Sequence, residues 1–492
     1  MKKTLIILTL FISTWGTSQN IYFIKSYGNS GYDFGRDIKQ DLDTGYIATG
    51  SSSSFSSGTA DAFLLKVDSL GNFKWSYNYG GAETDWGESV VVTHDSSYAI
   101  GGYTNSFGAG GFDFYLVRAG RDGTPLWEKT YGGSDWDRAH SMVQLADSGF
   151  VLVGDTYSYG NGNSDVFIVR TDKNGDTLWT RTYGGTENDY ANAVLLDGDS
   201  LVVVGGTESF GAGMSDGLIL KYHINGTLGW NKVVGKERID FFTSITSNNL
   251  GEYFLGGSRH YYFDQTGYLA DFWIYNMSDD GNTLLADTSL TGGSHEYEVV
   301  NDIVVDGNDN IFFGGETKSF GNAVQDLASD AFFGKLLNTY YQANFVDTYG
   351  AGGDDVINAL DNCYDNGFVG IGDLTFNSIG GKNIHIIRVD KSNSLGGFNV
   401  IQDLINDNIT LSFEDITNEI YISVYPTLFS DKLTITDLPA ENQIQIYNNS
   451  GQLVLDKINI NSTLDLSFLS NGLYILKIQT EKGVATTKII KE

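Results

Sequence analysis

An acidic residue recurs at seven positions along most of the chain. These positions are Asp33, Asp85, Asp137, Asp189, Asp240, Glu298 and Asp355. Carboxylate oxygens are hard ligands that suit Ca²⁺, so these residues could hold a cation or form a negatively charged docking face. An acid at a turn also caps free backbone N–H groups, and a residue repeated in every unit serves what every unit needs. We favour turn capping, keep Ca²⁺ as the alternative, and expect no other cofactor.

Two further series follow the same repeat. One comprises Asp61, Asp113, Asp165, Asp216, Asp271 and Asp330, with Asn383 in the seventh place. The other comprises Trp75, Trp127, Trp179 and Trp230, which we expect to pack between neighbouring units. The chain therefore contains seven units of about 52 residues.

Each unit is expected to form four short strands. In the third unit they cover residues 141–145, 149–156, 166–171 and 177–183, with tight turns after the first and third strands. Seven such antiparallel units predict an all-β protein with a seven-bladed β-propeller. In such a ring the first strand of each blade is innermost, and both acidic series lie on one face.

The beginning of the chain adds a prediction about how the ring closes. Residues 21–28 (IYFIKSYG) align with the fourth strand of other units, such as residues 126–132 (LWEKTYG). If the seventh unit contributes only three strands, this N-terminal strand would complete it and leave no exposed sheet edge. In the alternative, residues 398–401 provide the missing strand.

Catalytic signatures are few. The six histidines form no H-E-x-x-H pattern, and no G-x-S-x-G motif is present. Residues that break the repeat gather in the fifth and sixth units, at Arg259, His260, Tyr261, Tyr262 and His295. We expect a non-enzymatic binding or adhesion scaffold for an extracellular protein or glycan. The alternative is a secreted polysaccharide-acting enzyme, a glycosidase or lyase, with its site in those two units.

The N-terminus and the charge indicate where the protein acts. Residues 1–18 combine a basic start, a short apolar run and small residues, which is the pattern of a secretory signal peptide. We expect no transmembrane segment, because no later run is long and apolar enough. The formal charge of −31 repels nucleic acid. Cys363 has no disulfide partner and is expected in the core, and we expect a monomer.

The repeat resembles a known class. Motifs such as GG-x(3)-D and D-x-F-x-V-R-x-D-x-x-G-x-x-x-W, which occur in the third unit and the turn after it, resemble bacterial β-propeller repeats of the SBBP type. The resemblance covers residues 21–395 and is strongest in the first four units. It implies an architecture and no particular activity.

The last seventy residues resemble the C-terminal sorting domain of the type IX secretion system of Bacteroidetes. The resemblance rests on Val424-Tyr425-Pro426, on residues 444–453 (IQIYNNSGQL) and 466–476 (LSFLSNGLYIL), and on the basic end at 488–491. It points to the region marked by Tyr425, Pro426, Gly451, Gly472 and Lys488. It implies type IX secretion machinery as a partner, and a secreted or surface-attached protein.

Alternating apolar residues independently predict a small β-sandwich in this C-terminal region. The expected organisation is a signal peptide at 1–18, a propeller at 19–396, a linker at 397–420 and the sorting domain at 421–492.

Overall fold

The computed structural model divides the chain into two compact units, Met1–Leu411 and Ser412–Glu492. The residues that it describes are 23–54, 56, 58–264, 267–290, 297–318, 328–337, 342–349, 353–375, 381–389, 408–410, 423–425, 428–429, 431–436, 442–448, 453–458, 463–480 and 483–491. The predicted signal peptide at 1–18 lies outside these residues, as does the alternative closing strand at 398–401. Within the described residues, no helix is long and apolar enough to cross a membrane.

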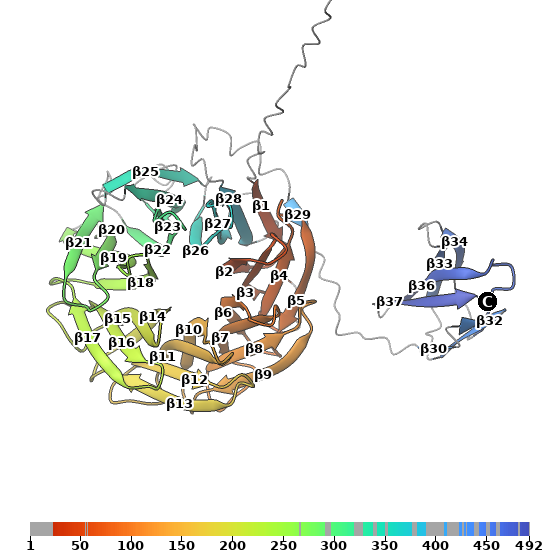
Figure 1. Cartoon of the computed structure of the whole chain (residues 1–492), viewed down its shortest axis with the longest axis horizontal. Coiled ribbons are helices and arrows are strands. Elements are labelled where there is room, and N and C mark those ends of the chain that lie inside the picture. The colour runs from red at the N-terminus through yellow and green to blue at the C-terminus, as the bar shows by residue number, and fades with distance from the viewer. Residues whose placement is uncertain are drawn as a thin grey trace, which may run out of the picture. The chain divides into compact units, whose positions relative to one another are not determined.

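In its described residues, the first unit contains seven sheets arranged in a ring, which we number as blades in chain order (Figure 1). Blades 1 to 3 comprise β2 (Asp33–Gln40), β3 (Tyr46–Ser52), β4 (Asp61–Val67), β5 (Phe73–Tyr79), β6 (Asp85–Val92), β7 (Tyr98–Thr104), β8 (Asp113–Ala119), β9 (Pro125–Tyr131), β10 (Asp137–Gln144), β11 (Phe150–Thr156), β12 (Asp165–Thr171) and β13 (Thr177–Tyr183).

Blades 4 to 6 comprise β14 (Asp189–Asp197), β15 (Ser200–Thr207), β16 (Asp216–His223), β17 (Leu228–Val234), β18 (Asp240–Ser247), β19 (Tyr253–Asp264), β20 (Gly267–Met277), β21 (Leu284–Leu290), β22 (Glu298–Val305), β23 (Ile311–Thr317), β24 (Asp330–Leu337) and β25 (Gln342–Tyr349). Blade 7 comprises β26 (Val356–Asn362), β27 (Phe368–Leu374), β28 (Asn383–Val389) and β1 (Phe23–Gly28). The prediction of an all-β, seven-bladed propeller is confirmed.

The middle strands of each blade are buried on both faces because neighbouring blades pack against them. β3, β4, β11 and β12 are buried at every residue. The hydrophobic core consists of clusters that each join two consecutive blades. One cluster unites Ile47 and Leu64 of blade 1 with Ile100 and Val117 of blade 2. Burial therefore holds the blades together and leaves the ends of the strands available for function.

The repeated tryptophans pack against the turn between the third and fourth strands of the next blade. A Cβ atom on Gly175 would lie 2.8 Å from the Trp127 ring, so glycine permits this contact, and its φ of +81° also favours glycine. Tyr131 donates a hydrogen bond of 2.6 Å to the Gly175 carbonyl. Trp75 and Tyr79 make the same contacts with Gly123. The predicted packing of these tryptophans between blades is confirmed.

The N-terminal strand is the outer strand of blade 7. β1 pairs antiparallel with β28, with Phe23 opposite Arg388. Phe23 stands where other blades carry tryptophan and packs against Gly71 of blade 1, while Tyr27 donates to the Gly71 carbonyl over 2.5 Å. β29 (Asn408–Thr410) pairs in parallel with the other edge of β1. It lies within the predicted linker at 397–420, whose other residues are outside the described part of the chain.

The second unit forms two sheets around its own core. Their strands are β30 (Ser423–Tyr425), β32 (Lys432–Thr436) and β35 (Thr463–Asp465) in one sheet, and β31 (Leu428–Phe429), β37 (Gly483–Lys491), β36 (Gly472–Thr480), β33 (Asn442–Asn448) and β34 (Leu453–Ile458) in the other. Leu433 and Ile435 of the first sheet belong to one buried cluster with Ile444, Ile446 and Leu476 of the second. The predicted small β-sandwich is confirmed.

Candidate functional site

The seven repeated acids at the head of the inner strands are buried, each with at most 1% of its surface exposed. Asp137 shows the arrangement. Its carboxylate accepts the Gly133 N–H over 2.7 Å, the Ser158 hydroxyl over 2.8 Å and the Thr156 hydroxyl. In blades 1 to 5 the head acid accepts the N–H of the residue four positions earlier. These carboxylates therefore cap the turns between blades, as the favoured interpretation predicts.

In the remaining two blades the residue four positions earlier lies outside the described part of the chain, and the head acids contact the end of the second strand. Glu298 faces the Thr317 hydroxyl at 3.4 Å, and Asp355 accepts the Thr375 N–H over 2.8 Å. Both contacts reach the end of the second strand of the same blade or the residue that follows it. The head acid thus holds the same buried position throughout the ring.

The second acidic series meets the first in pairs. A Cβ on Gly132 would lie 2.0 Å from an oxygen of Asp113 and 2.6 Å from one of Asp137, so this glycine separates two carboxylates from consecutive blades. Burial, together with the neighbouring Asp137, raises the pKa of Asp113. Within the described residues, no group of three or more His, Cys, Asp or Glu side chains is arranged to hold a metal ion.

The inner strands line a central channel with a volume of about 780 Å³. Every inner strand contains a β-bulge three residues after the head acid, where the pairing with the second strand slips by one. A bulge redirects a side chain and is often found beside active sites. The bulged residues all face the channel, and they are Arg36, Glu88, His140, Asn192, Thr243, Asn301 and Asn358. Sequence reasoning missed this set because its members differ from blade to blade.

A continuous row of aromatic rings runs along one end of the channel, across blades 1 to 3. We call it the aromatic arc, and it consists of Tyr32, Phe34, Trp86, Tyr103, Phe112, Trp136 and Tyr157. Consecutive ring centroids lie 5.2–6.4 Å apart. Every member lies at the end of the strands that carries the head acids, which we call the mouth face. Tyr32, Trp136 and Tyr157 are exposed, and the other four rings are half-buried.

Charged groups lie beside the arc and are paired with one another. Arg36 is 3.8 Å from Glu88, and its guanidinium lies 5.0 Å from the Trp86 ring centre. Asp155 accepts from Arg138 at 2.9 Å and contacts His140 at 2.8 Å. Burial opposes the charge of Asp155, but these two partners hold its pKa below the usual value. The mouth of blades 1–3 thus combines ring faces with hydrogen-bonding groups whose charges are compensated.

Further down the channel, three carboxylates surround one lysine. Asp37 accepts the Val90 N–H, Asp302 the Leu360 N–H and Asp361 the Gln40 N–H, each over 2.7–2.8 Å and each across a blade boundary. Burial raises the pKa of Asp302 to about 7 and that of Asp361 to about 6, although Lys39 opposes both shifts. These contacts join the inner strands of blades 1, 2, 6 and 7.

The residues singled out in the fifth unit separate into two kinds. Arg259 is buried, pairs with Asp287 at 2.7 Å and stacks over Trp273 at 4.1 Å, which is a packing role. His260 is half-buried on the mouth face, with ring contacts to Phe241 and Tyr297, and burial lowers its pKa. His295 and the side chains of Tyr261 and Tyr262 lie outside the described part of the structure.

Cys363 is buried, as the sequence predicts. Burial raises the pKa of its thiol to about 12. Because the thiolate is the reactive form, this cysteine is unreactive near neutral pH.

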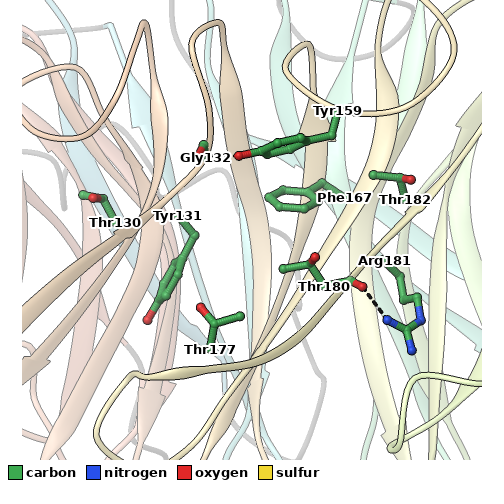
Figure 2. Close-up of a pocket in the computed structure, with 9 residues that line it drawn as sticks. All are labelled: Thr130, Tyr131, Gly132, Tyr159, Phe167, Thr177, Thr180, Arg181 and Thr182. Atoms are coloured by element: carbon green, nitrogen blue, oxygen red, sulfur yellow. Dashed lines mark hydrogen bonds between the residues drawn. The ribbon is translucent and has the colours of Figure 1, made fainter.

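A second concave surface of about 680 Å³ lies outside the ring, between the outer strands of blades 2 and 3 (Figure 2). At the preceding blade junction, the Tyr115 hydroxyl donates to Glu128. The corresponding residues here are Phe167 and Thr180, which are smaller and make no such bond. The hydroxyl of Tyr159, which lines this surface, donates to the Gly132 carbonyl at 2.8 Å. The pocket thus presents threonine hydroxyls and ring faces.

The sorting residues are only partly described. Tyr425 ends β30, Gly472 begins β36, and Lys488 pairs with Ile475 across β36 and β37. Pro426 and Gly451 lie outside the described residues. The Lys491 ammonium is buried and donates to the carbonyls of Leu466 and Ser467, at 2.9 and 3.0 Å. This contact fixes the last strand against the loop after β35.

Residues 423–492 match the family model of the secretion system C-terminal sorting domain. The C-terminal unit is a type IX sorting domain. A chain with this sorting domain is exported and is either attached to the outer cell surface or released. The sorting domain also implies interaction with the type IX secretion machinery.

Other comparisons give distant similarities. The regulatory protein FlaEY of Caulobacter vibrioides is 26% identical over 178 residues, which cover 31% of this chain and 18% of FlaEY. PorZ, a surface component of the type IX secretion system of Porphyromonas gingivalis, is 12% identical with a TM-score of 0.40, covering 93% of this chain and 59% of PorZ. The Pan2 WD40 domain of Neurospora crassa is 8% identical with a TM-score of 0.43, covering 73% of this chain and 89% of that domain. This chain thus spans less than a fifth of FlaEY and less than two thirds of PorZ.

Proposed function

We propose that this protein is an exported binding scaffold without catalytic activity, and that it holds an extracellular glycan or protein on its mouth face. The aromatic arc carries the proposal. It leaves three large rings exposed at 57%, 48% and 41% for Tyr32, Trp136 and Tyr157, beside the charged bulged residues. A row of exposed rings next to polar groups is the composition of a recognition surface.

The acids beside the arc support binding over hydrolysis. A glycosidase needs two available carboxyl groups, one of which keeps its proton near neutral pH. Asp155 is engaged by Arg138 and His140 and has a lowered pKa, and Glu88 faces Arg36. Burial raises the pKa of Asp373, but this acid is only 4% exposed and accepts the Gly35 N–H over 3.1 Å.

The test exposes the full mature chain to polysaccharides and to isolated extracellular matrix, and measures retention and product release in parallel. We expect retention without sugar products. Retention should fall in Tyr157→Ala and stay unchanged in Tyr364→Ala, because Tyr364 is 67% exposed in a turn at the opposite end of the strands.

Release of sugar products that disappears in His260→Ala would contradict the proposal. That outcome would favour the polysaccharide-acting enzyme, with the neutral His260 imidazole as a candidate base.

A further inference from the structure

We propose that the ligand of the mouth face is an uncharged glycan chain, whose sugar rings lie on the aromatic arc across blades 1 to 3. This inference rests on the proposed binding function and adds the chemical class of the ligand. It depends on how the rings are held, which polar groups adjoin them, and how far the arc extends.

The rings of the arc are held in place before any ligand binds. A Cβ on residue 111 would lie 2.1 Å from Cδ1 of Trp136, so the glycine at this position leaves the space that the indole needs. The Trp136 carbonyl accepts the Tyr157 N–H over 2.7 Å, and the Trp136 N–H donates to Asp135 at 2.9 Å. The Arg138 guanidinium lies 5.9 Å from the ring centres of both Trp136 and Tyr157. Rings fixed in this way lose little conformational entropy when a ligand binds.

The polar groups next to these rings suit hydroxyl groups better than charges. Arg36, Arg138 and His140 keep about 30% of their side-chain surface exposed, so each remains partly open to solvent. Each is already paired with a carboxylate, so the site offers no uncompensated positive charge to an anionic ligand. Hydroxyl groups can both donate to Glu88, whose side chain is partly exposed, and accept from the guanidinium groups.

Sugar rings fulfil both requirements. One face of a pyranose presents C–H groups that pack on an aromatic ring, while its edge presents hydroxyls to planar polar side chains. The net charge of −31 further disfavours polymers that carry carboxylate or sulfate groups. The arc runs over three blades as a row of consecutive rings, so an extended chain fits it better than a monosaccharide.

The experiment uses the full mature chain in native gels cast with single polysaccharides. The neutral probes are β-1,3-glucan, β-1,4-mannan and xylan, and the acidic probes are alginate and polygalacturonate. We expect retardation by at least one neutral polymer, no retardation by the acidic polymers, and no weakening at high salt, because the contact involves no ion pairs with the ligand.

Two variants locate the contact. Trp136→Ala should weaken binding of the neutral polymer about tenfold, since it removes one exposed stacking ring. Gly111→Ala should weaken it too while keeping every ring, because the added Cβ displaces the indole. Tyr364→Ala is the matched control and should bind as the unaltered chain does. Melting temperatures of all three confirm that the ring remains folded.

Several results would overturn the inference: no binding to any neutral polymer, preference for the acidic ones, or full binding by both arc variants. Failure of the glycan class can be separated from failure of the proposed function. If Trp136→Ala abolishes retention on a protein component of the matrix while no polysaccharide binds, the mouth face binds a protein and the glycan assignment is wrong. If retention is unaffected by either arc variant, both proposals are wrong.

Discussion

Blades 1–3 and blades 4–7 use the same bulged position in opposite ways. In blades 4–7 the bulged residues are Asn192, Thr243, Asn301 and Asn358, and each donates to a backbone carbonyl of the following blade. In blades 1–3 they are Arg36, Glu88 and His140, which contact charged side chains instead. One backbone irregularity thus joins blades in one part of the channel and presents charged groups in the other.

In a repeat fold, an individual function resides where the blades differ. The aromatic arc occupies the same three blades as the charged bulged residues, whereas the head acids are alike in all seven blades and are buried. Features common to every blade serve the ring itself. Features confined to some blades are free to serve a ligand.

Loss of ring closure should have the largest effect on stability. It tests whether blades 4–7, which include the closing blade 7, hold the ring together. A mature chain that begins at Asn29 lacks β1, which leaves an edge of β28 unpaired and removes Phe23 and Tyr27 from Gly71. We expect the cooperative unfolding transition of the propeller to disappear in calorimetry. A chain that begins at Asn20 is the control. A transition that survives unchanged at Asn29 would show that β1 does not close the ring.

Substitutions of the bulged residues should reduce stability by different amounts in blades 1–3 and in blades 4–7. Asn358→Ala removes a 2.7 Å hydrogen bond to the Gly35 carbonyl across the boundary between blades 7 and 1. We expect a loss of about 1–2 kcal/mol in unfolding free energy, because the Gly35 carbonyl loses its donor between the two blades. His140→Ala should cost less than about 0.5 kcal/mol, since Asp155 keeps Arg138. Urea unfolding of both variants measures the difference, and equal losses would remove the distinction.

The acids that surround Lys39 predict that the stability of the propeller depends on pH. Two of them, Asp302 and Asp361, belong to blades 4–7. Burial raises the pKa of Asp302 to about 7, well above the ordinary value of about 3.9. The folded protein therefore holds this proton more tightly than the unfolded chain. Its contribution is fully present below about pH 4 and is lost as the pH rises through about 7.

Asp302→Asn should remove most of this dependence, because the amide keeps an acceptor for the Leu360 N–H without the titration. Thermal melting at several pH values between about 4 and 8 measures it. A parallel pH profile in the variant and the unaltered chain would contradict the assignment.

Calcium should have the smallest effect. The head acids already accept backbone N–H and hydroxyl groups, so we expect the same melting curve in Ca²⁺ and in chelator. A higher melting temperature in Ca²⁺, with bound metal detected by mass spectrometry, would instead support the cation alternative.

The parts of the fold that repeat could be predicted from the sequence. Turn residues, tryptophans and head acids recur with one period, and the similarity of residues 21–28 to other fourth strands pointed to β1. Capping by Asp137 was predictable for the same reason, because the same N–H contact recurs in blades 1 to 5.

The candidate site could not be predicted in this way. Trp86, His140 and Tyr157 are far apart in sequence and share no motif, and only the ring brings their side chains together. A bulge three residues after the head acid leaves no residue signature when that residue can be Arg, Glu, His, Asn or Thr. A search for inner-strand positions that differ between otherwise similar blades would have found the set.

The pairing of Phe23 with Arg388 also sets an order of events for the newly made chain. Blades 1 to 6 are built from neighbouring hairpins and can form as soon as each segment is available. Blade 7 needs the first and the last strands of the array together, and bringing such distant segments into contact is entropically unfavourable. The ring therefore closes last, after the whole array has been delivered to the compartment where it folds. Until then the edges of β1 and β28 are open to pairing with other chains, so escort during export matters most for these two strands.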